Sequence, residues 1–327
     1  MTRRGWNALL REGGIGLALV VLIIIFTLLS PDFASLRNLR NVLNQITINT
    51  ILAIGMTFVI LVGGIDLSVG SLLAFSIMMT GVVMELQGLP PGLAIFFGIL
   101  AGLGTGVASG FLNGWISERW RLPSFIVTLG MLNIARGAAL LTTDAQTLYQ
   151  FPPAFTAFGT KAIFGNVVPL IFLVALALVL ISWFILNRTV FGRLVYAIGT
   201  NEEAVRLSGH RPGMIKVAVF TISGLTAGIA GIINMSRLTV ASPIVGVGFE
   251  LSAIAAVIIG GTSLFGGKGS VIGTFIGACI IGVLQNGLIL LGVEDFLRQM
   301  ITGLVIILAV ILDYYRNKFS ERSRAAV

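Results

Sequence analysis

Long hydrophobic runs alternate with short polar segments along most of the chain. A helix that crosses a bilayer needs about 20 mostly apolar residues, and by this criterion the pattern predicts about ten membrane-spanning helices. The third run follows the second closely and the eighth is short, which marks one of them as a candidate re-entrant or broken helix. The predicted ranges are 14–30, 46–62, 67–86, 92–113, 123–141, 166–186, 215–235, 250–264, 271–291 and 297–312.

The composition supports an all-α membrane protein. Of the 327 residues, 56% are hydrophobic and only 10% are charged, against about 25% charged in an ordinary soluble domain. The net charge of +8 does not indicate nucleic-acid binding, because the basic residues sit mostly in short gaps between apolar runs. No second domain is visible, so a single transmembrane domain is expected over 1–327, and the lipid bilayer is its expected surrounding.

The distribution of Lys and Arg predicts the orientation of the chain. Cytoplasmic segments of membrane proteins carry an excess of these residues. Most of the 21 Lys and Arg residues fall on one side if 1–13, 187–214 and 313–327 are cytoplasmic. This arrangement requires an even number of spans and places both termini in the cytoplasm. The residues on the other side are Arg37, Arg40, Lys161, Arg237 and Arg298, and Arg136 lies within a span.

Two similar glycine-containing segments follow apolar runs. Residues 63–71 read GGIDLSVGS, and 260–267 read GGTSLFGG. Acidic residues within membrane segments are candidates for function, so Asp66 is either a gate element or, like Ser68, a helix cap. The similarity of the two segments indicates either an internal duplication, as many transporters have, or coincidence in a glycine-rich chain.

Glycines also recur at every fourth position of the fourth run, which places them on one helix face. Small residues at this spacing let helices approach closely in lipid. Tight packing is the simpler prediction, and a contact that slides during transport is the alternative. The glycines are Gly98, Gly102, Gly106, Gly110 and Gly114.

The polar segment 187–214 contains a predicted short helix over 200–208. Asn201 is a plausible N-cap and Gly209 a plausible stop, with Pro212 just beyond. A short, charged, capped helix on the cytoplasmic side suits docking to a soluble partner. A solvated surface helix without a partner is the alternative.

Signatures of enzymes and nucleotide-binding proteins are missing from the sequence. GTSLFGGKG lacks the spacing of a phosphate-binding loop, since Gly269 follows Lys268 where that loop needs Ser or Thr. His210 is the only histidine and has no nucleophile or metal partner in a matching pattern. We therefore expect no catalytic residues, no metal site and no cofactor in this chain.

Several segments resemble the permeases of bacterial ABC importers. Glu203-Ala204-Val205-x-x-x-Gly209 is similar to their E-A-A-x-x-x-G signature, with Val in place of the second Ala. Residues 55–71, 129–148, 201–209 and 246–278, and the run through 287–293, resemble the ribose-type branch in particular. The resemblance covers the chain from about 40 to 313.

The resemblance implies a permease domain with a core like that of the vitamin B12 importer, in the bacterial inner membrane. It implies three partners: a cytoplasmic ATPase that uses ATP and Mg, a periplasmic sugar-binding protein, and a second permease copy or paralogue. The transported solute is expected to be ribose or a related sugar. The residues expected to couple to the ATPase are Asn201, Glu202, Glu203, Ala204, Arg206 and Gly209.

Polar residues within or near the spans are the candidates for the translocation pathway or gate, because unpaired polar groups are costly in lipid. They are Asp66, Ser68, Asn133, Glu250 and Asn286. The same acids leave a rival hypothesis open, a secondary transporter coupled to an ion through Asp66, Arg136 or Glu250. A membrane-embedded enzyme is a third and weaker hypothesis.

Overall fold

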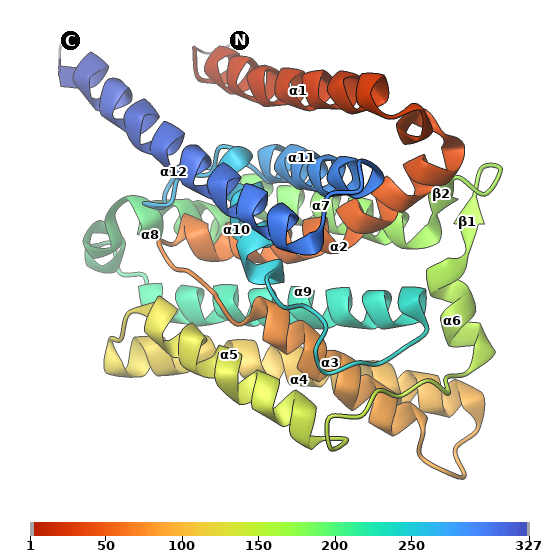
Figure 1. The fold of residues 1–327 in the computed structure, drawn as a ribbon. Helices are drawn as coiled ribbons and strands as arrows, with labels where there is room; N and C mark the ends of the chain where they lie inside the picture. The colour runs from red at the N-terminus through yellow and green to blue at the C-terminus, as the bar shows by residue number, and fades with distance from the viewer. Residues whose placement is uncertain (1–2, 326–327) are drawn as a thin grey trace.

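The computed structural model describes residues 3–325, and its architecture is almost entirely helical (Figure 1). A two-stranded antiparallel hairpin pairs Ala162 with Pro169 and Ile163 with Val168. The elements, in order, are α1 (Arg3–Leu29), a 3-10 helix (Pro31–Ala34), α2 (Leu36–Leu61), α3 (Val69–Met84), α4 (Pro91–Trp120), α5 (Ser124–Leu141), α6 (Pro153–Thr160), β1 (Ala162–Ile163), β2 (Val168–Pro169), α7 (Leu170–Arg188), α8 (Val190–Leu207), α9 (Pro212–Leu238), α10 (Phe249–Ile259), α11 (Val271–Leu290) and α12 (Asp295–Ala325).

Every predicted apolar run overlaps one of these helices. Within the described residues, six helices are long and apolar enough to cross a membrane: α2, α4, α5, α7, α9 and α11. The apolar part of α1 and the whole of α3 and α10 are shorter. The chain is thus a multi-pass helical membrane protein, and the predicted total of ten spans stays a prediction.

Helix α2 forms the centre of the bundle. Every residue from 46 to 62 is buried, because this stretch is apolar almost all round. Two of its hydroxyls are satisfied locally, as Thr47 Oγ1 donates to the carbonyl of Leu43 and Thr57 Oγ1 to that of Ala53, each at 2.7 Å. Helices α7, α9, α10 and α11 all pack directly on α2.

The third and eighth apolar runs form the two short interior helices. Run 67–86 gives α3 and run 250–264 gives α10, with 16 and 11 residues respectively. Each is joined to its neighbour by an irregular segment, 62–68 before α3 and 260–270 after α10. The candidate broken helix therefore has two counterparts in the structure.

The glycines of α4 form its contacts with two neighbouring helices. A Cβ at Gly98 or Gly102 would press on the side chains of Met84 and Thr80 in α3. A Cβ at Gly106 or Gly110 would collide with the carbonyls of Gly224 and Phe220 in α9. Gly114 continues the row and lies against Val217 of α9. The backbones of α4 and α9 thus touch directly.

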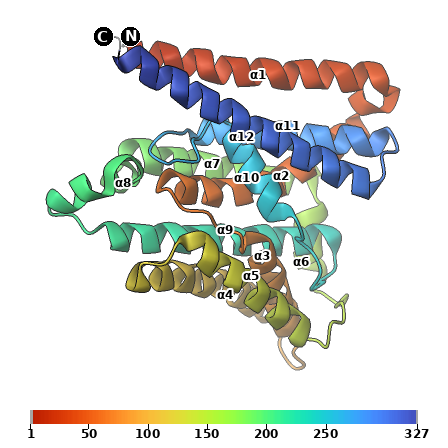
Figure 2. The same ribbon diagram turned by 60° about the vertical axis from the view of Figure 1, so that its left-hand side comes forward.

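The two ends of the bundle differ in structure. In Figures 1 and 2, α1 begins and α12 ends at the end of the bundle that carries α8, whereas α6 and the hairpin lie at the opposite end. The predicted polar segment 187–214 is more helical than expected, because α8 already starts at Val190. The Thr189 hydroxyl caps it by accepting from Gly192 N at 3.1 Å, and the buried Val195 and Ile198 fix its inner face.

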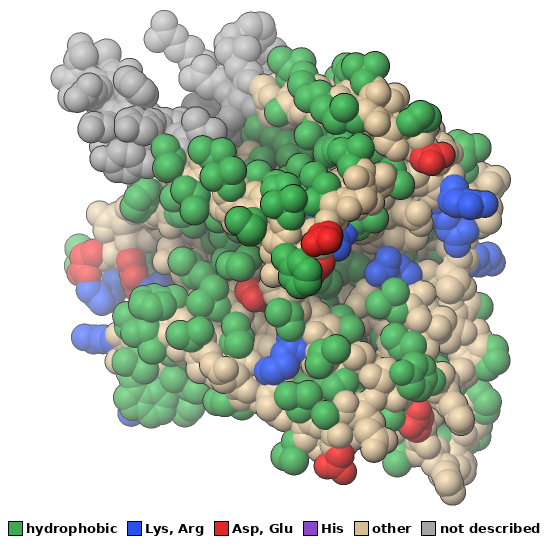
Figure 3. Space-filling view, viewed as in Figure 1, with side chains coloured by type: hydrophobic (Ala, Val, Ile, Leu, Met, Phe, Trp, Pro, Cys, Tyr) green, Lys and Arg blue, Asp and Glu red, His purple; other side chains and the backbone are tan. Residues whose placement is uncertain are grey.

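Hydrophobic side chains cover much of the surface, and charged ones form small separate groups (Figure 3). Leu100 of α4, Ile134 of α5, Leu180 of α7 and Leu304 of α12 are each more than half exposed. A soluble monomer rarely exposes so much contiguous apolar surface. These faces suit contact with lipid or with other membrane helices.

Candidate functional site

The turn between α2 and α3, residues 62–68, is held by hydroxyl groups of α5. Ile65 N donates to Ser124 Oγ and Leu67 N donates to Thr128 Oγ1, each at 3.1 Å. Thr128 Oγ1 in turn donates to the carbonyl of Ile65 at 3.1 Å. These bonds satisfy backbone groups that would otherwise be unpaired in the interior of the bundle.

Asp66 lies in this turn with its side chain fully buried. Oδ1 accepts from the Ser68 backbone at 3.0 Å and from the Ser68 hydroxyl at 2.6 Å. Oδ2 accepts from Ser223 Oγ of α9 at 2.8 Å. Asn113 of α4 donates to Ser68 Oγ at 2.9 Å. This Asp66 network therefore joins the turn to both α4 and α9.

The predicted capping role of these two residues differs in detail from the structure. Ser68 occupies the N-cap position of α3, but its hydroxyl makes no capping bond because it donates to Asp66. Within residues 3–325, no ion pair includes Asp66. The carboxylate acts as an acceptor for neutral donors, and a role in gating stays a prediction.

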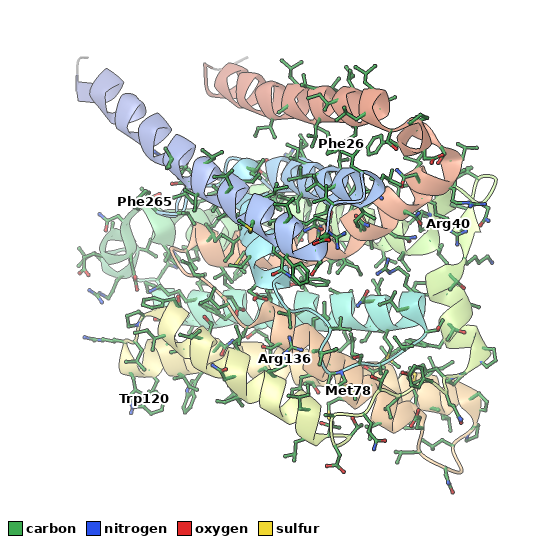
Figure 4. All side chains as sticks on the ribbon, in the orientation of Figure 1. Phe26, Arg40, Met78, Trp120, Arg136 and Phe265 are labelled. Carbon is green, nitrogen blue, oxygen red and sulfur yellow. The ribbon has the colours of Figure 1, made fainter. Side chains whose placement is uncertain are left out.

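Glu250 and Arg136 organise the segment between α9 and α10. Arg136 Nη1 donates to the carbonyls of Pro243 and Val245, the latter at 2.9 Å (Figure 4). Glu250 Oε1 accepts from Gly248 N at 3.2 Å in the first turn of α10. A Cβ at Gly70, near the start of α3, would collide with the carbonyl of Gly246 and with the Glu250 carboxylate. The starts of α3 and α10 thus lie against each other.

The remaining two pathway candidates lie elsewhere. Asn133 is exposed on α5 and donates only to Leu129 O of its own helix, at 3.1 Å. Asn286 of α11 is buried and accepts from Asn38 Nδ2 of α2 at 2.8 Å. The structure brings Asp66 and Ser68 together and places Glu250 beside the same helix start, but it separates Asn133 and Asn286 from them.

The helix predicted over 200–208 is present as the last part of α8. Asn201 has non-helical angles of φ −160° and ψ 96° and divides α8 into two pieces. Its Oδ1 accepts from Ala204 N at 3.0 Å, which confirms the predicted N-cap. Gly209 has φ +83° and ends the helix, with Gly209 N bound to Arg206 O and His210 N bound to Val205 O. We refer to residues 201–209 as the docking helix, after the role that the sequence predicts for them.

An ion bridge that sequence reasoning missed fixes the docking helix to two other helices. Lys216 Nζ of α9 lies 2.7 Å from Glu202 Oε2 and 3.1 Å from Glu118 Oε1 of α4. Glu203 and Arg206 form a second pair within the docking helix, and both side chains are exposed. The sequence singled out Glu202, Glu203 and Arg206 but not Glu118 or Lys216, because no local pattern links α9 to α4.

An open cleft of about 800 Å³ lies beside this bridge. Its walls come from the α2–α3 turn, the end of α4 and the start of α9, together with the docking helix. The charged residues that line it are Glu118, Arg121, Glu202, Glu203, Arg206 and Lys216. In Figure 3 acidic and basic side chains gather over α8 at the left edge.

The first piece of α8 packs on both glycine-containing turns. Gly267 N donates to Leu61 O at 2.9 Å, so the two turns are in contact. A Cβ at Gly199 would collide with Leu61 O and the Gly267 backbone. Tyr196 OH also donates to Gly269 O at 3.1 Å. Helix α8 therefore covers the point where the two turns meet.

The two turns share a helix cap and little else. Gly63 N and Gly64 N bind Ile60 O and Val59 O, and Gly261 N and Thr262 N bind Ile258 O and Val257 O in the same way. Gly63 and Gly261, with φ of +79° and +82°, therefore occupy equivalent positions. The sequence match had instead aligned Gly63 with Gly260, one position earlier. Gly70 lies in the first turn of α3 whereas Gly267 lies in a loop, so the match does not extend through the motif.

Comparisons with known proteins agree over most of the chain. Residues 38–310 match the family described as branched-chain amino acid transport system / permease component. The chain is 42% identical to the ribose import permease protein RbsC of Haemophilus influenzae, over 91% of this chain and 92% of that protein. Identity to RbsC of Escherichia coli is 43% over the same shares, and identity to the D-allose transport system permease protein AlsC is 41% over 92% of this chain and 90% of that protein. No solved structure matches the chain.

Proposed function

The chain belongs to the family of branched-chain amino acid transport system permease components, and from this premise we propose that it is the membrane-spanning subunit of an ATP-driven importer of ribose or a related monosaccharide. As a permease component it is a transport subunit and not an enzyme. The observation that carries the choice of solute is the similarity, over nearly the full length, to permeases named for ribose, allose, arabinose and fructose.

The docking helix supports ATP-driven transport over the ion-coupled alternative. A short capped helix at one end of the bundle, with exposed charges at Glu203 and Arg206, offers a rigid surface to a soluble partner. Asp66, one of the acids that ion coupling could use, has both carboxylate oxygens hydrogen-bonded to Ser68 and Ser223, which favours a structural role for it.

The proposed assembly follows from the same premise. The ATPase docks on residues 201–209 and uses ATP and Mg, while this chain carries no cofactor. A sugar-binding protein delivers the solute at the end with α6 and the hairpin, and a second permease copy or paralogue completes the pathway. Ten spans with cytoplasmic termini, in the bacterial inner membrane, are part of the proposal, as is a core like that of the vitamin B12 importer.

Uptake by the reconstituted importer tests the solute and the energy source together. The permease, its ATPase and its binding protein are placed in proteoliposomes, and ribose, allose, arabinose, fructose and leucine are offered as radiolabelled solutes. We expect ATP-dependent uptake of at least one sugar and none of leucine. Leucine uptake, or sugar uptake driven by an ion gradient without ATP, would overturn the proposal.

Two variants test the docking helix. Glu203→Arg reverses an exposed charge, and Gly209→Pro removes the positive φ that ends the helix. We expect both proteins to insert normally and to lose sugar uptake. Normal uptake by both would remove residues 201–209 from the ATPase contact.

Cysteine labelling tests the orientation. Gln146→Cys and Arg206→Cys are made separately in a Cys279→Ala background, since both side chains are exposed at opposite ends of the bundle. A membrane-impermeant thiol reagent added to intact cells should label the first and not the second. The reverse pattern would place the docking helix outside.

A further inference from the structure

We infer that Lys216 is a positioning residue that passes movement of the docking helix to the buried Asp66 network. The inference rests on the proposed function, because it assumes that an ATPase moves the docking helix. It adds a residue that the sequence did not single out and a physical route into the bundle. Lys216 contacts neither the solute nor ATP.

The attachment of the docking helix makes Lys216 the natural point of transfer. The break at Asn201 separates this helix from the first piece of α8, so it can tilt on its own. Val205 is its only buried side chain. The Glu202–Lys216 contact is therefore its principal polar link to another helix, and 19% exposure of the Lys216 side chain leaves this ion pair partly shielded from water.

Lys216 also joins the two helices that receive the movement. One ammonium group lies between Glu202 and Glu118, so its single positive charge is shared by two carboxylates from different helices. Without it these two acids would repel each other across the cleft. Helices α4 and α9 are already held together by direct backbone contact at Gly106 and Gly110, so a pull on Lys216 moves them as one body.

Each of these two helices carries a bond to the turn before α3. On α9, Ser223 lies about two helical turns beyond Lys216 on the same face, and it donates to Asp66. On α4, Asn113 lies little more than one turn before Glu118, and it donates to Ser68. A displacement at the bridge thus reaches the start of α3 by two routes, one along α9 and one along the antiparallel α4, each ending in a buried hydrogen bond.

The first experiment measures the number of ATP molecules hydrolysed per sugar transported by the complete importer in proteoliposomes. For Lys216→Met we expect at least a tenfold rise in this ratio, with ATP hydrolysis within twofold of the unmodified importer. Lys216→Arg should stay within threefold, because a guanidinium can bridge both carboxylates. Arg188→Met is the matched control and should leave the ratio unchanged, since Arg188 lies over the Trp183 ring of its own helix and is in none of the ion pairs between described residues.

A second variant tests the inference even if Lys216→Met alone fails to fold. Glu118→Gln combined with Lys216→Met removes one of the two repelling acids, so it should accumulate in the membrane even where Lys216→Met does not. It should show the same uncoupling. An unchanged ratio in the accumulating variant, or ATP hydrolysis and transport that fall in equal proportion, would overturn the inference.

A distance measurement separates this inference from the proposed function, because it needs no sugar. Spin labels are placed on Leu207→Cys and Trp120→Cys, both more than half exposed, in a Cys279→Ala background. With Lys216 intact, the label distance should be the same with and without ATP. With Lys216→Met the distribution of label distances should broaden or shift when ATP is added. If ATP leaves the label distance the same in the Lys216→Met protein as in the Lys216 protein, the inference about Lys216 is wrong, even if sugar uptake is normal. If the distance shifts as expected but no sugar is taken up, only the assignment of the solute is wrong.

Discussion

The contact between α4 and α9 and the contact between α8 and the bundle are built from different chemistry. Helices α4 and α9 meet through glycines, with the backbone of Gly106 against that of Gly224. The docking helix of α8 is held by a salt bridge in which Lys216 lies between two partly exposed acids, Glu202 and Glu118. The first contact has almost no freedom to adjust, because backbone atoms cannot rotate away. The second can lengthen by rotation of flexible side chains.

The difference suggests which parts of the molecule move as a unit. A glycine contact resists change in either direction, since separation loses packing and approach produces overlap. This geometry supports the tight-packing prediction for Gly106 and Gly110 over the sliding contact. An ion bridge at the end of the bundle can transmit force and also re-form. The following changes break or sharpen this comparison.

The largest effect is expected for Gly110→Leu. A leucine side chain here would overlap the Phe220 carbonyl of α9. This carbonyl is part of the helix backbone and cannot rotate away. We expect a loss of more than about 3 kcal/mol of stability and little protein in the membrane. Gly104→Leu is the control on the same helix, because no atom lies within 4 Å of its Cβ position. Membrane protein level and thermal unfolding in detergent measure both, and equal levels would show that α4 and α9 are free to separate.

Removal of the Asp66 carboxylate should have the next largest effect. Asp66→Ala leaves the Ser68 backbone and the Ser68 and Ser223 hydroxyls without their acceptor, at a cost of about 2 to 3 kcal/mol. Asp66→Asn keeps an acceptor oxygen and should cost less than about 1 kcal/mol and retain transport. Unfolding and uptake are measured in parallel. A stable but inactive Asn variant would assign the charge to a gate.

A smaller effect is expected for Gly199→Ala. The added methyl group would meet Leu61 O and the Gly267 backbone, so α8 must shift away from the two turns. Because α8 lies at the end of the bundle, it can yield, and we expect a loss of about 1 kcal/mol. Sugar uptake should fall more than stability. A destabilisation as large as that of Gly110→Leu would show that α8 is attached as firmly as α9.

The smallest effect is expected for Glu203→Gln. The Glu203–Arg206 pair lies within one helix turn, and the side chains are 54% and 60% exposed. Exposed pairs of this kind contribute less than about 0.5 kcal/mol, so the melting temperature in detergent should not change measurably. A large shift in melting temperature would mean that the docking helix contributes more to stability than its contacts indicate.

Local features of this fold were readable from the sequence. The apolar runs lie in helices, as predicted, because the length and composition of a run are enough to predict a membrane helix. The cap at Asn201 and the stop at Gly209 were also predictable, since a cap depends on residues within one turn. The start of α8 at Val190 was missed, because its signal is weak: a single Thr189 cap before a mixed sequence.

Long-range features were not readable. Ser124 binds the α2–α3 turn from a position 59 residues later, and Ser223 binds Asp66 from 157 residues later. No periodicity records such a pairing. The glycine match misled by one residue for a related reason: the position that needs positive φ is set by hydrogen bonds to the preceding helix turn, not by which glycines look alike.

The α2–α3 turn also has a consequence for how the chain enters the membrane. Helix α3 has 16 residues, fewer than the roughly 20 needed to span a bilayer. The turn before it depends on Ser124 and Ser223. At roughly 5–20 residues synthesised per second, these partners emerge about 3–12 s and 8–31 s after the turn. The hydrogen bonds that fix the start of α3 therefore form only after α5 and α9 have been synthesised, so its final placement is a late step of biogenesis.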